Sequence, residues 1–142
     1  YEAPRHKSWS AANRSTLIRI PAVRGEYTRV ELRSPDPSCN PYLAVAACLA
    51  AGLDGIARGL TPPPEVTDDV YAMDDSDRAA RNLDALPETL KDALDELERD
   101  ALIMDVLGDH VARSYLKGKR REWEEYQSRV SNWELEKYLV VY

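Results

Sequence analysis

The sequence predicts an α+β fold in which a β-hairpin is followed by several α-helices. Residues 15–20 and 28–33 alternate between apolar and polar side chains, as half-buried strands do. After residue 40, helix-starting and helix-stopping residues recur along the chain, and apolar residues return every three or four positions. The 142 residues, 44% of them hydrophobic and 31% charged, have the length and composition of one globular domain.

The second of the two strands carries the most informative pattern. Arg29, Glu31 and Arg33 point to one face. Val30 and Leu32 point to the other face, which we expect to pack on a core. A carboxylate between guanidinium groups on a rigid strand can hold a divalent cation beside polyanionic oxygens. An ordinary half-exposed strand with cross-strand ion pairs would show the same pattern, so the strand alone leaves both interpretations open.

The residues before this strand supply its partner. Pro21 ends the first strand and Arg24-Gly25-Glu26 forms a turn, so an antiparallel hairpin is the simplest arrangement. Arg14 lies five positions before Arg19 and cannot share an ideal strand face with it, so we place Arg14 at the mouth of the strand. Residues 1–13 are expected to form a polar loop that leads into the hairpin.

The middle of the chain predicts one long helix and one long loop. The helix starts at Asn40-Pro41, with Asn as cap and Pro at the first helical position, and runs to about Arg58 before Gly59 stops it. Its many alanines make it small-sided, so we expect it to be buried against other backbone. Residues 61–86 are Pro-rich and then acidic, which predicts a solvent-exposed loop with one helical turn near 76–82.

The last third of the chain predicts further helices. Pro87 is expected to open one at its first helical position, and Gly108 is expected to interrupt the helical run. Ser131 and Glu134 form the capping-box pattern that starts a final helix. Its large apolar residues are Trp133, Leu135, Tyr138, Leu139, Val140 and Val141. Because so many apolar side chains need a covering surface, we expect another subunit or domain to bury them.

The charges are unevenly distributed along the chain. The formal net charge is -6, which argues against nucleic acid and membrane surfaces as partners. The first 33 residues are nevertheless rich in basic residues, namely Arg5, Lys7, Arg14, Arg19, Arg24, Arg29 and Arg33 against Glu2, Glu26 and Glu31. This local arginine cluster predicts a small anionic ligand. Cys39 and Cys48 lack the spacing of a metal site and indicate reduced thiols, as expected in a cytoplasmic protein. The sequence also contains no apolar run long enough to span a bilayer.

A series of short motifs runs in order over essentially the whole chain. The motifs are Tyr1-Glu2-Ala3-Pro4, Asn13-Arg14-Ser15, Arg19-Ile20-Pro21, Arg29-Val30-Glu31-Leu32-Arg33, Ser34-Pro35-Asp36-Pro37-Ser38-Cys39-Asn40-Pro41-Tyr42, Ala51-Gly52-Leu53-Asp54-Gly55-Ile56, Gly108-Asp109-His110 and Trp133-Glu134. In this order they resemble the C-terminal third of a bacterial or archaeal type I glutamine synthetase. The resemblance implies that residues 1–142 are the C-terminal segment of that family's catalytic domain, without its N-terminal β-grasp domain and the rest of the catalytic domain.

The resemblance also implies an activity and its site residues. The family ligates ammonia to L-glutamate through γ-glutamyl phosphate, with ATP as substrate and Mg²⁺ or Mn²⁺ as cofactor. Glu31 matches a ligand of the divalent ion, and Arg33 matches an arginine that grips the carboxylate of glutamate. Arg14 matches an arginine that contacts both the transferred phosphoryl group of ATP and the bound glutamate. Phosphoryl transfer depends on such charge neutralisation more than on covalent chemistry.

Other positions match residues around this centre. Arg19 and Arg29 match arginines on the ATP side. Glu2 matches the acid of a flap that closes over the site, binds glutamate and helps shape the ammonium pocket. Tyr71 falls at about the position of the family's modifiable tyrosine, but its flanks differ from those of the modified subtype, so an ordinary loop tyrosine is the alternative.

The resemblance implies a larger assembly as well. Family members form dodecamers of two hexameric rings, with each active site between neighbouring subunits and the C-terminal helix packed into the opposite ring. One metal carboxylate cannot assemble this site, so we expect the 142 residues alone to be inactive. Two alternatives remain open: a non-catalytic assembly or interaction fragment, and a relative that ligates glutamate to an amine other than ammonia.

Overall fold

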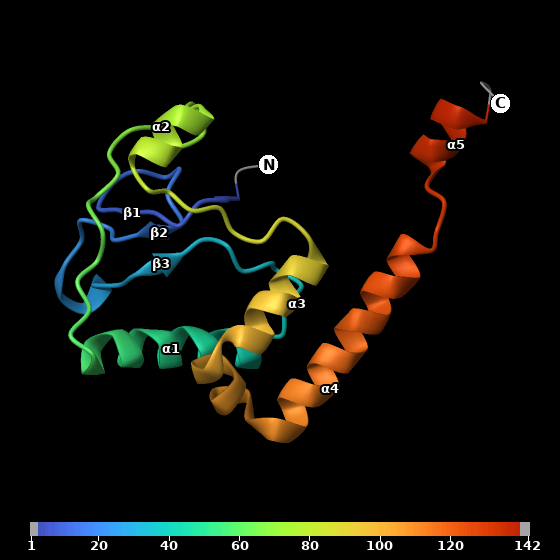
Figure 1. The fold of residues 1–142 in the computed structure, drawn as a ribbon. Coiled ribbons are helices and arrows are strands. Elements are labelled where there is room, and N and C mark those ends of the chain that lie inside the picture. The colour runs from blue at the N-terminus through green and yellow to red at the C-terminus, as the bar shows by residue number, and fades with distance from the viewer. Residues whose placement is uncertain (1–2, 140–142) are drawn as a thin grey trace. The chain divides into compact units, whose positions relative to one another are not determined.

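The computed structural model describes residues 3–139, and the chain divides between residues 86 and 87 into two compact units. Strands precede most of the helices, so the predicted α+β fold is confirmed (Figure 1). The elements are β1 (Trp9–Ser10), β2 (Ile18–Arg19), a 3-10 turn (Gly25–Tyr27), β3 (Glu31–Leu32), α1 (Pro41–Ala57), α2 (Asp75–Ala80), α3 (Leu90–Arg99), α4 (Ala101–Gln127) and α5 (Asn132–Tyr138).

The sheet of the first unit has the order β1-β2-β3 (Figure 1). Strands β2 and β3 pair in antiparallel register, with Ile18 opposite Leu32 and Arg19 opposite Glu31, so the predicted hairpin is confirmed. Strand β1 pairs in parallel with β2 and was not predicted, because residues 1–13 were expected to be a polar loop. Strand β1 has only two residues, which is too few for an alternation of apolar and polar side chains to be recognised in the sequence.

The segment predicted as an exposed loop, residues 61–86, instead supplies the core of the first unit. Val66, Val70 and Met73 are buried together, and Leu83 packs against them. The acidic residues between them face solvent, and these obscured the apolar positions in the sequence. The predicted helical turn is present as α2. The buried residues alternate along the chain with Glu65, Thr67, Asp69 and Tyr71, which line the pocket described below.

The apolar face of β3 was expected to pack on a core, and this prediction is wrong for the described chain. Val30 is 64% exposed and Leu32 is 39% exposed. The alternation correctly divides the two faces, but no other described segment covers the apolar one.

Helix α1 has the predicted ends. The side chain of Asn40 accepts hydrogen bonds from the backbone N–H groups of Tyr42 and Leu43, at 3.0 and 3.3 Å. Gly59 adopts a φ of 60°, in the left-handed region that favours glycine, just after the helix ends. The prediction that the helix is buried is not met, because the described structure buries none of its residues. Cys48 on this helix is a free, exposed thiol.

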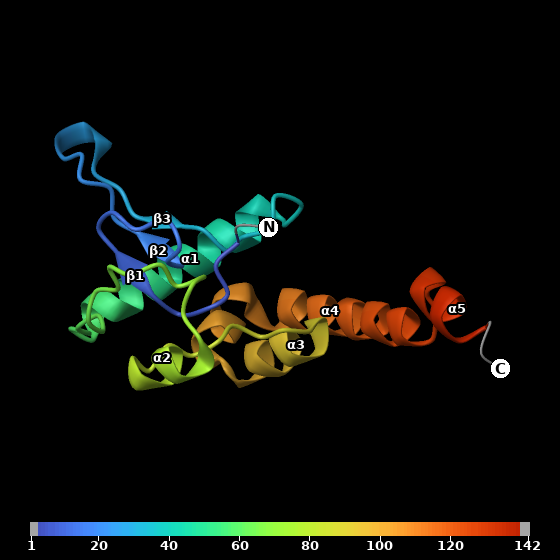
Figure 2. The ribbon, with the colours of Figure 1, turned by 90° about the horizontal axis from the view of Figure 1, so that it is seen from above.

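The second unit is built on α3 and α4, which lie side by side (Figure 2). Leu94 of α3 and Ala112 and Leu116 of α4 are its buried residues. The start predicted at Pro87 is wrong: Thr89 caps α3 by accepting a hydrogen bond from the N–H of Asp92 at 3.1 Å. The cap belongs to the residue whose hydroxyl reaches that N–H, and a preceding proline cannot replace it.

The last two predicted helix signals are confirmed. Gly108 has a φ of 70° and interrupts α4, as its place in the sequence predicted. Ser131 and Glu134 form the capping box of α5, with both reciprocal hydrogen bonds present. Trp133, Leu135 and Leu139 are exposed, whereas Val140 and Val141 lie outside the described residues. Among residues 3–139, no helix combines the length and apolarity needed to cross a membrane.

Candidate functional site

The hairpin brings Arg19, Arg29 and Glu31 together. Arg19 and Glu31 are cross-strand partners, and Arg29 lies two residues before Glu31 on the same face of the chain. Nη1 of Arg19 donates to Oε2 of Glu31 at 2.9 Å. Nε of Arg29 donates to Oε1 of the same carboxylate, also at 2.9 Å. The contacts confirm the predicted shared face of Arg29 and Glu31, Arg19 reaches them from the neighbouring strand, and Arg33 lies in the pocket described next.

These contacts determine the ionisation of Glu31. Hydrogen bonds from Arg19 first and from Arg29 second lower the pKa of Glu31 below its usual value of 4.5, although desolvation of the carboxylate acts in the opposite direction. The buried Nε of Arg19 has no hydrogen-bond partner among the described residues. An unpaired buried donor costs about 1–3 kcal/mol.

Glu31 can serve as one ligand of a divalent cation. A carboxylate offers about four acceptor positions. Hydrogen bonds from Arg19 and Arg29 use two of them, and Nη2 of Arg29 adds an ion-pair contact with Oε1 at 2.7 Å. Within residues 3–139 there is no group of three or more His, Cys, Asp or Glu side chains placed to hold a metal. The described chain therefore fits a cation that takes one ligand here and the rest of its roughly six oxygens elsewhere.

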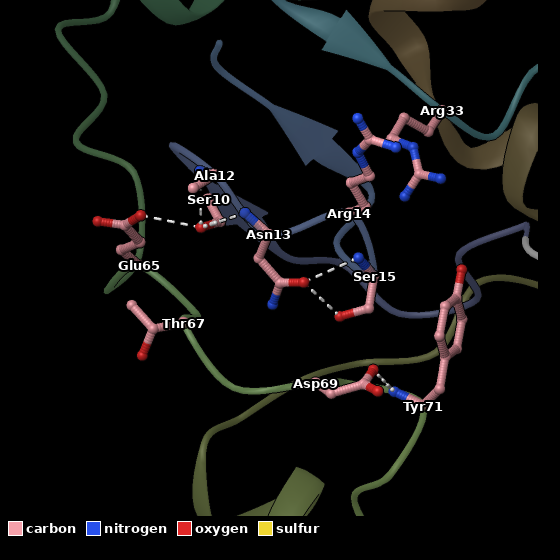
Figure 3. A pocket seen from close by; sticks show the side chains of 10 residues that line it. All are labelled: Ser10, Ala12, Asn13, Arg14, Ser15, Arg33, Glu65, Thr67, Asp69 and Tyr71. Atoms are coloured by element: carbon pink, nitrogen blue, oxygen red, sulfur yellow. Dashed lines mark hydrogen bonds between the residues drawn. The ribbon is translucent and has the colours of Figure 1, made fainter. Parts of the chain in front are cut away.

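Next to the hairpin lies an open pocket of about 990 Å³. Its lining residues are Ser10, Ala12, Asn13, Arg14, Ser15, Arg33, Glu65, Thr67, Asp69 and Tyr71. The guanidinium groups of Arg14 and Arg33 lie at the same end of it (Figure 3). Arg33 is steadied by a 3.3 Å hydrogen bond from its Nη1 to the carbonyl oxygen of Thr16. Two guanidinium groups that face one space favour an anion with planar oxygens, such as a carboxylate or a phosphoryl group.

The other side of the pocket carries negative charge. Glu65 accepts hydrogen bonds from the N–H of Ala11 at 2.8 Å and from the hydroxyl of Ser10 at 2.9 Å. These bonds, the one from Ala11 first, lower the pKa of Glu65. Asp69 accepts a 3.0 Å hydrogen bond from the backbone N–H of Tyr71. The lining of one pocket therefore contains two arginines and two hydrogen-bonded carboxylates.

The predicted site residues fall into two groups. Arg19, Arg29 and Glu31 form the ion-paired cluster, and Arg14, Arg33 and Tyr71 line the pocket. Glu2 lies outside the described residues.

Seven of the ten pocket residues were not among the predicted site residues, and three of these carry polar groups that matter below: Asn13, Glu65 and Asp69. Asn13 was noted only as part of a motif, and Glu65 and Asp69 were assigned to an exposed loop. The one usable signal was the run of three prolines before Glu65, because it stiffens the chain that enters this segment.

Comparison with known proteins identifies the family. Residues 1–138 match the family described as the glutamine synthetase catalytic domain. The chain belongs to the glutamine synthetase family. It is 50% identical to the glutamine synthetase of Thermotoga maritima over 141 residues and 51% identical to that of Thermus thermophilus over 142 residues. These alignments cover 99% and 100% of this chain but 32% of each relative, so the chain spans about a third of their length.

Solved structures of the family share the fold. A GmaS complex with ADP superposes on 96% of this chain with a TM-score of 0.82 at 36% identity, and 30% of that chain is covered. Glutamine synthetase of Plasmodium falciparum gives a TM-score of 0.76 over 97% of this chain and 35% of its own, at 21% identity, which supports the fold alone. The expectation that these residues are a segment of a glutamine synthetase catalytic domain therefore agrees with both sequence and structure.

Proposed function

We propose that this chain supplies one wall of the active site of a glutamine synthetase, which ligates ammonia to L-glutamate at the expense of ATP. The observation that carries the proposal is the convergence of Arg14 and Arg33 on one pocket in a chain of this family. An acyl phosphate intermediate requires both a bound carboxylate and a neutralised phosphoryl group. Paired guanidinium groups provide contacts for both.

The two pocket arginines are proposed to bind different groups of the substrates. Arg33 is held by the carbonyl oxygen of Thr16 and is proposed to grip a carboxylate of glutamate. Arg14 is proposed to contact the transferred phosphoryl group and the bound glutamate. Positive charge fixed in advance costs no reorganisation when negative charge develops on the phosphoryl oxygens. Glu2 is proposed to act from the flap and to contribute to the ammonium pocket.

The cluster around Glu31 is proposed to serve the nucleotide. Arg19 and Arg29 would bind ATP through the parts of their guanidinium groups that stay accessible, since their side chains are 23% and 50% exposed. Glu31 would contribute one ligand to Mg²⁺ or Mn²⁺. When bound, such an ion neutralises charge on the phosphate oxygens and orients them. A related GmaS structure contains ADP, which supports a nucleotide site in this fold.

The proposal extends to the assembly and to the chain by itself. Full activity is proposed to require the rest of the catalytic domain, because residues 3–139 hold no group of three or more side chains placed to bind a metal. The full-length protein is proposed to be a cytoplasmic homo-oligomer, a dodecamer of two hexameric rings, as the family resemblance implies. The isolated 142 residues should show no turnover in a ligase or γ-glutamyl transferase assay. Tyr71 is 48% exposed beside the pocket and is the candidate for modification, with an unmodified loop tyrosine as the alternative.

The test is an Arg33→Ala substitution in the natural protein that contains this chain. Loss of a charged hydrogen bond to substrate should raise the KM for glutamate roughly tenfold to hundredfold, with little change in the KM for ATP. Glutamine formation is measured with each substrate varied in turn, and ammonia is then replaced by small primary amines. Preference for an amine over ammonia would instead establish the alternative ligase.

A matched control removes an arginine of the second unit that does not line the pocket. Arg113 of α4 is exposed and forms an ion pair with Asp109, so Arg113→Ala should leave both KM values unchanged. Equal increases in the KM for glutamate and for ATP in Arg33→Ala would exclude a glutamate-specific role. Absence of any ligase activity in the unsubstituted protein would overturn the proposed function itself.

A further inference from the structure

We propose that Asn13 is a positioning residue that fixes Arg14 by joining the turn at residues 13–15 to the segment 66–70. This inference rests on the proposed function, because Arg14 is taken to contact substrate. The side chain of Arg14 makes no hydrogen bond or ion pair with the described residues 3–139, so nothing there steadies its guanidinium directly. Among the described residues, the hydrogen bonds of its two neighbours therefore fix the backbone from which the Arg14 side chain projects.

The side-chain amide of Asn13 uses its full hydrogen-bonding capacity. Nδ2 donates to the carbonyl oxygens of Val66 at 3.2 Å and Asp68 at 2.6 Å. Oδ1 accepts from the backbone N–H of Ser15 at 2.9 Å and from its hydroxyl at 2.8 Å. An asparagine amide has two donor hydrogens and two acceptor lone pairs, and all four are used. The side chain of Asn13 thus bonds both to Ser15, the residue after Arg14, and to the segment 66–70, more than fifty residues along the chain.

Ser15, on the other side of Arg14, is also bonded to the segment 66–70, and we call the bonds from Asn13 and Ser15 to this segment the clamp. Its hydroxyl accepts a hydrogen bond from the backbone N–H of Val70 at 2.9 Å. Both Ser15 and Val70 are buried, so this bond is protected from water. The hydroxyl of Ser15 is at the same time oriented by Asn13, as Figure 3 shows. Arg14 therefore lies between two residues that are each anchored to the segment 66–70.

The same segment is tied to the chain just before Asn13. The carboxylate of Glu65 accepts from Ser10 and Ala11, and the N–H of Val66 donates to the carbonyl oxygen of Trp9 at 3.0 Å. These contacts form a continuous seam of hydrogen bonds. Asn13 stands out within the seam because it alone bonds both to the segment and to the residue after Arg14.

The chemistry of the amide is specific. An aspartate at position 13 would keep the acceptor for Ser15 but would lose both donors. It would also place a carboxylate against the carbonyl oxygens of Val66 and Asp68, which repel it. Asn13→Asp therefore separates the clamp to the segment 66–70 from the local turn at Ser15. If Asn13 only shaped that turn, the aspartate would behave like the asparagine.

The first measurement is hydrogen–deuterium exchange in the natural protein, which does not depend on activity. Asn13→Ala and Asn13→Asp should both increase exchange across residues 66–70, including the N–H of Val70. The matched control is Arg81→Ala, which removes the 2.5 Å ion pair between Arg81 and the side chain of Asp68 on the same segment. It leaves the amide of Asn13 untouched and should not loosen residues 13–15. Unchanged exchange in Asn13→Asp would refute the clamp, whether or not the protein is a ligase.

The second measurement asks whether Asn13 acts through Arg14. In a ligase assay, Asn13→Ala should lower kcat/KM for glutamate by up to about 100-fold, the scale of a misplacement near 1 Å, while Arg81→Ala should not. In an Arg14→Ala background, Asn13→Ala should cause little further loss. Additive losses would show a general structural role and overturn the proposal. If the unsubstituted protein has no ligase activity, the proposed function fails, and the exchange result alone decides the clamp.

Discussion

At the scale of single residues, Glu31 shows how geometry determines a charge. A glutamate on an exposed strand face would normally be exchangeable for a glutamine at little cost. Here two guanidinium groups contact its oxygens, and Arg19 is brought there by cross-strand pairing rather than by sequence proximity. The carboxylate is therefore held ionised and in one orientation, which its proposed role as a metal ligand requires.

The lowered pKa of Glu31 predicts a specific pH dependence of stability. A carboxyl group whose pKa is lower in the folded state stabilises it above the unfolded pKa, and that contribution is lost as the pH falls through the folded pKa. Near neutral pH, Glu31→Gln should therefore unfold at a lower urea concentration than the unsubstituted protein. The difference should shrink as the pH falls below the usual value of 4.5 and the wild-type carboxylate becomes protonated.

The control is Glu26→Gln, in the exposed turn between the two hairpin strands. Urea unfolding followed by tryptophan fluorescence at neutral and acid pH measures the two substitutions side by side. A difference between Glu31→Gln and wild type that stays constant across this range would contradict the assigned cause of the pKa shift.

Site residues were predictable where local alternation places them. Period-two spacing put Arg29 and Glu31 on one face, and the contacts confirm it. Asn13 was not predictable as a clamp, because its partners are carbonyl oxygens 53 and 55 residues away and its amide is uncharged. Charge patterns reveal ion pairs, but nothing in one sequence reports which backbone groups an amide will meet.

At the scale of elements, the helix ends that were predicted correctly depend on chemistry within one turn. Asn40 caps α1, and Ser131 with Glu134 caps α5, because a side-chain oxygen needs to reach only two or three residues onward. Strand β1 and the buried segment at 66–73 were missed for the opposite reason. Their partners come from elsewhere in the chain, and polar neighbours outnumber the apolar residues that decide the burial.

Two glycines of α4 predict opposite effects of the same substitution. Gly108 has a φ of 70°, so Gly108→Ala should destabilise the protein by about 1–2 kcal/mol through strain in the left-handed region. Gly118 lies inside the helix, and an added Cβ there meets no atom within 4 Å, so Gly118→Ala should stabilise it by about 0.5–1 kcal/mol. Denaturation of the two variants beside wild type measures both. A shift of the same sign for both would show that backbone conformation does not decide the effect.

At the scale of the whole molecule, large apolar side chains stay exposed on two separate helices. Tyr42 and Ile56 of α1 are 84% and 78% exposed, and Trp133 of α5 is 61% exposed. Relatives are about three times as long as this chain, which covers 32% of them. We infer that further protein covers both helices, with the rest of the catalytic domain on α1 and another subunit on α5. Exposed surfaces of this kind mark interfaces in soluble proteins.

The apolar groove of α5 gives the subunit inference a direct test. Leu135, Leu139, Tyr138 and Val130 line this groove of about 380 Å³ in the second unit. In the natural protein, the double substitution Leu135→Ser with Leu139→Ser should weaken the assembly, because burying each leucine contributes about 1.5–3 kcal/mol. Sedimentation velocity at falling protein concentration should then show smaller species than wild type. Glu136→Ser, at an exposed position of the same helix outside the groove, is the matched control and should sediment unchanged. An intact assembly in the double variant would exclude α5 as a subunit contact.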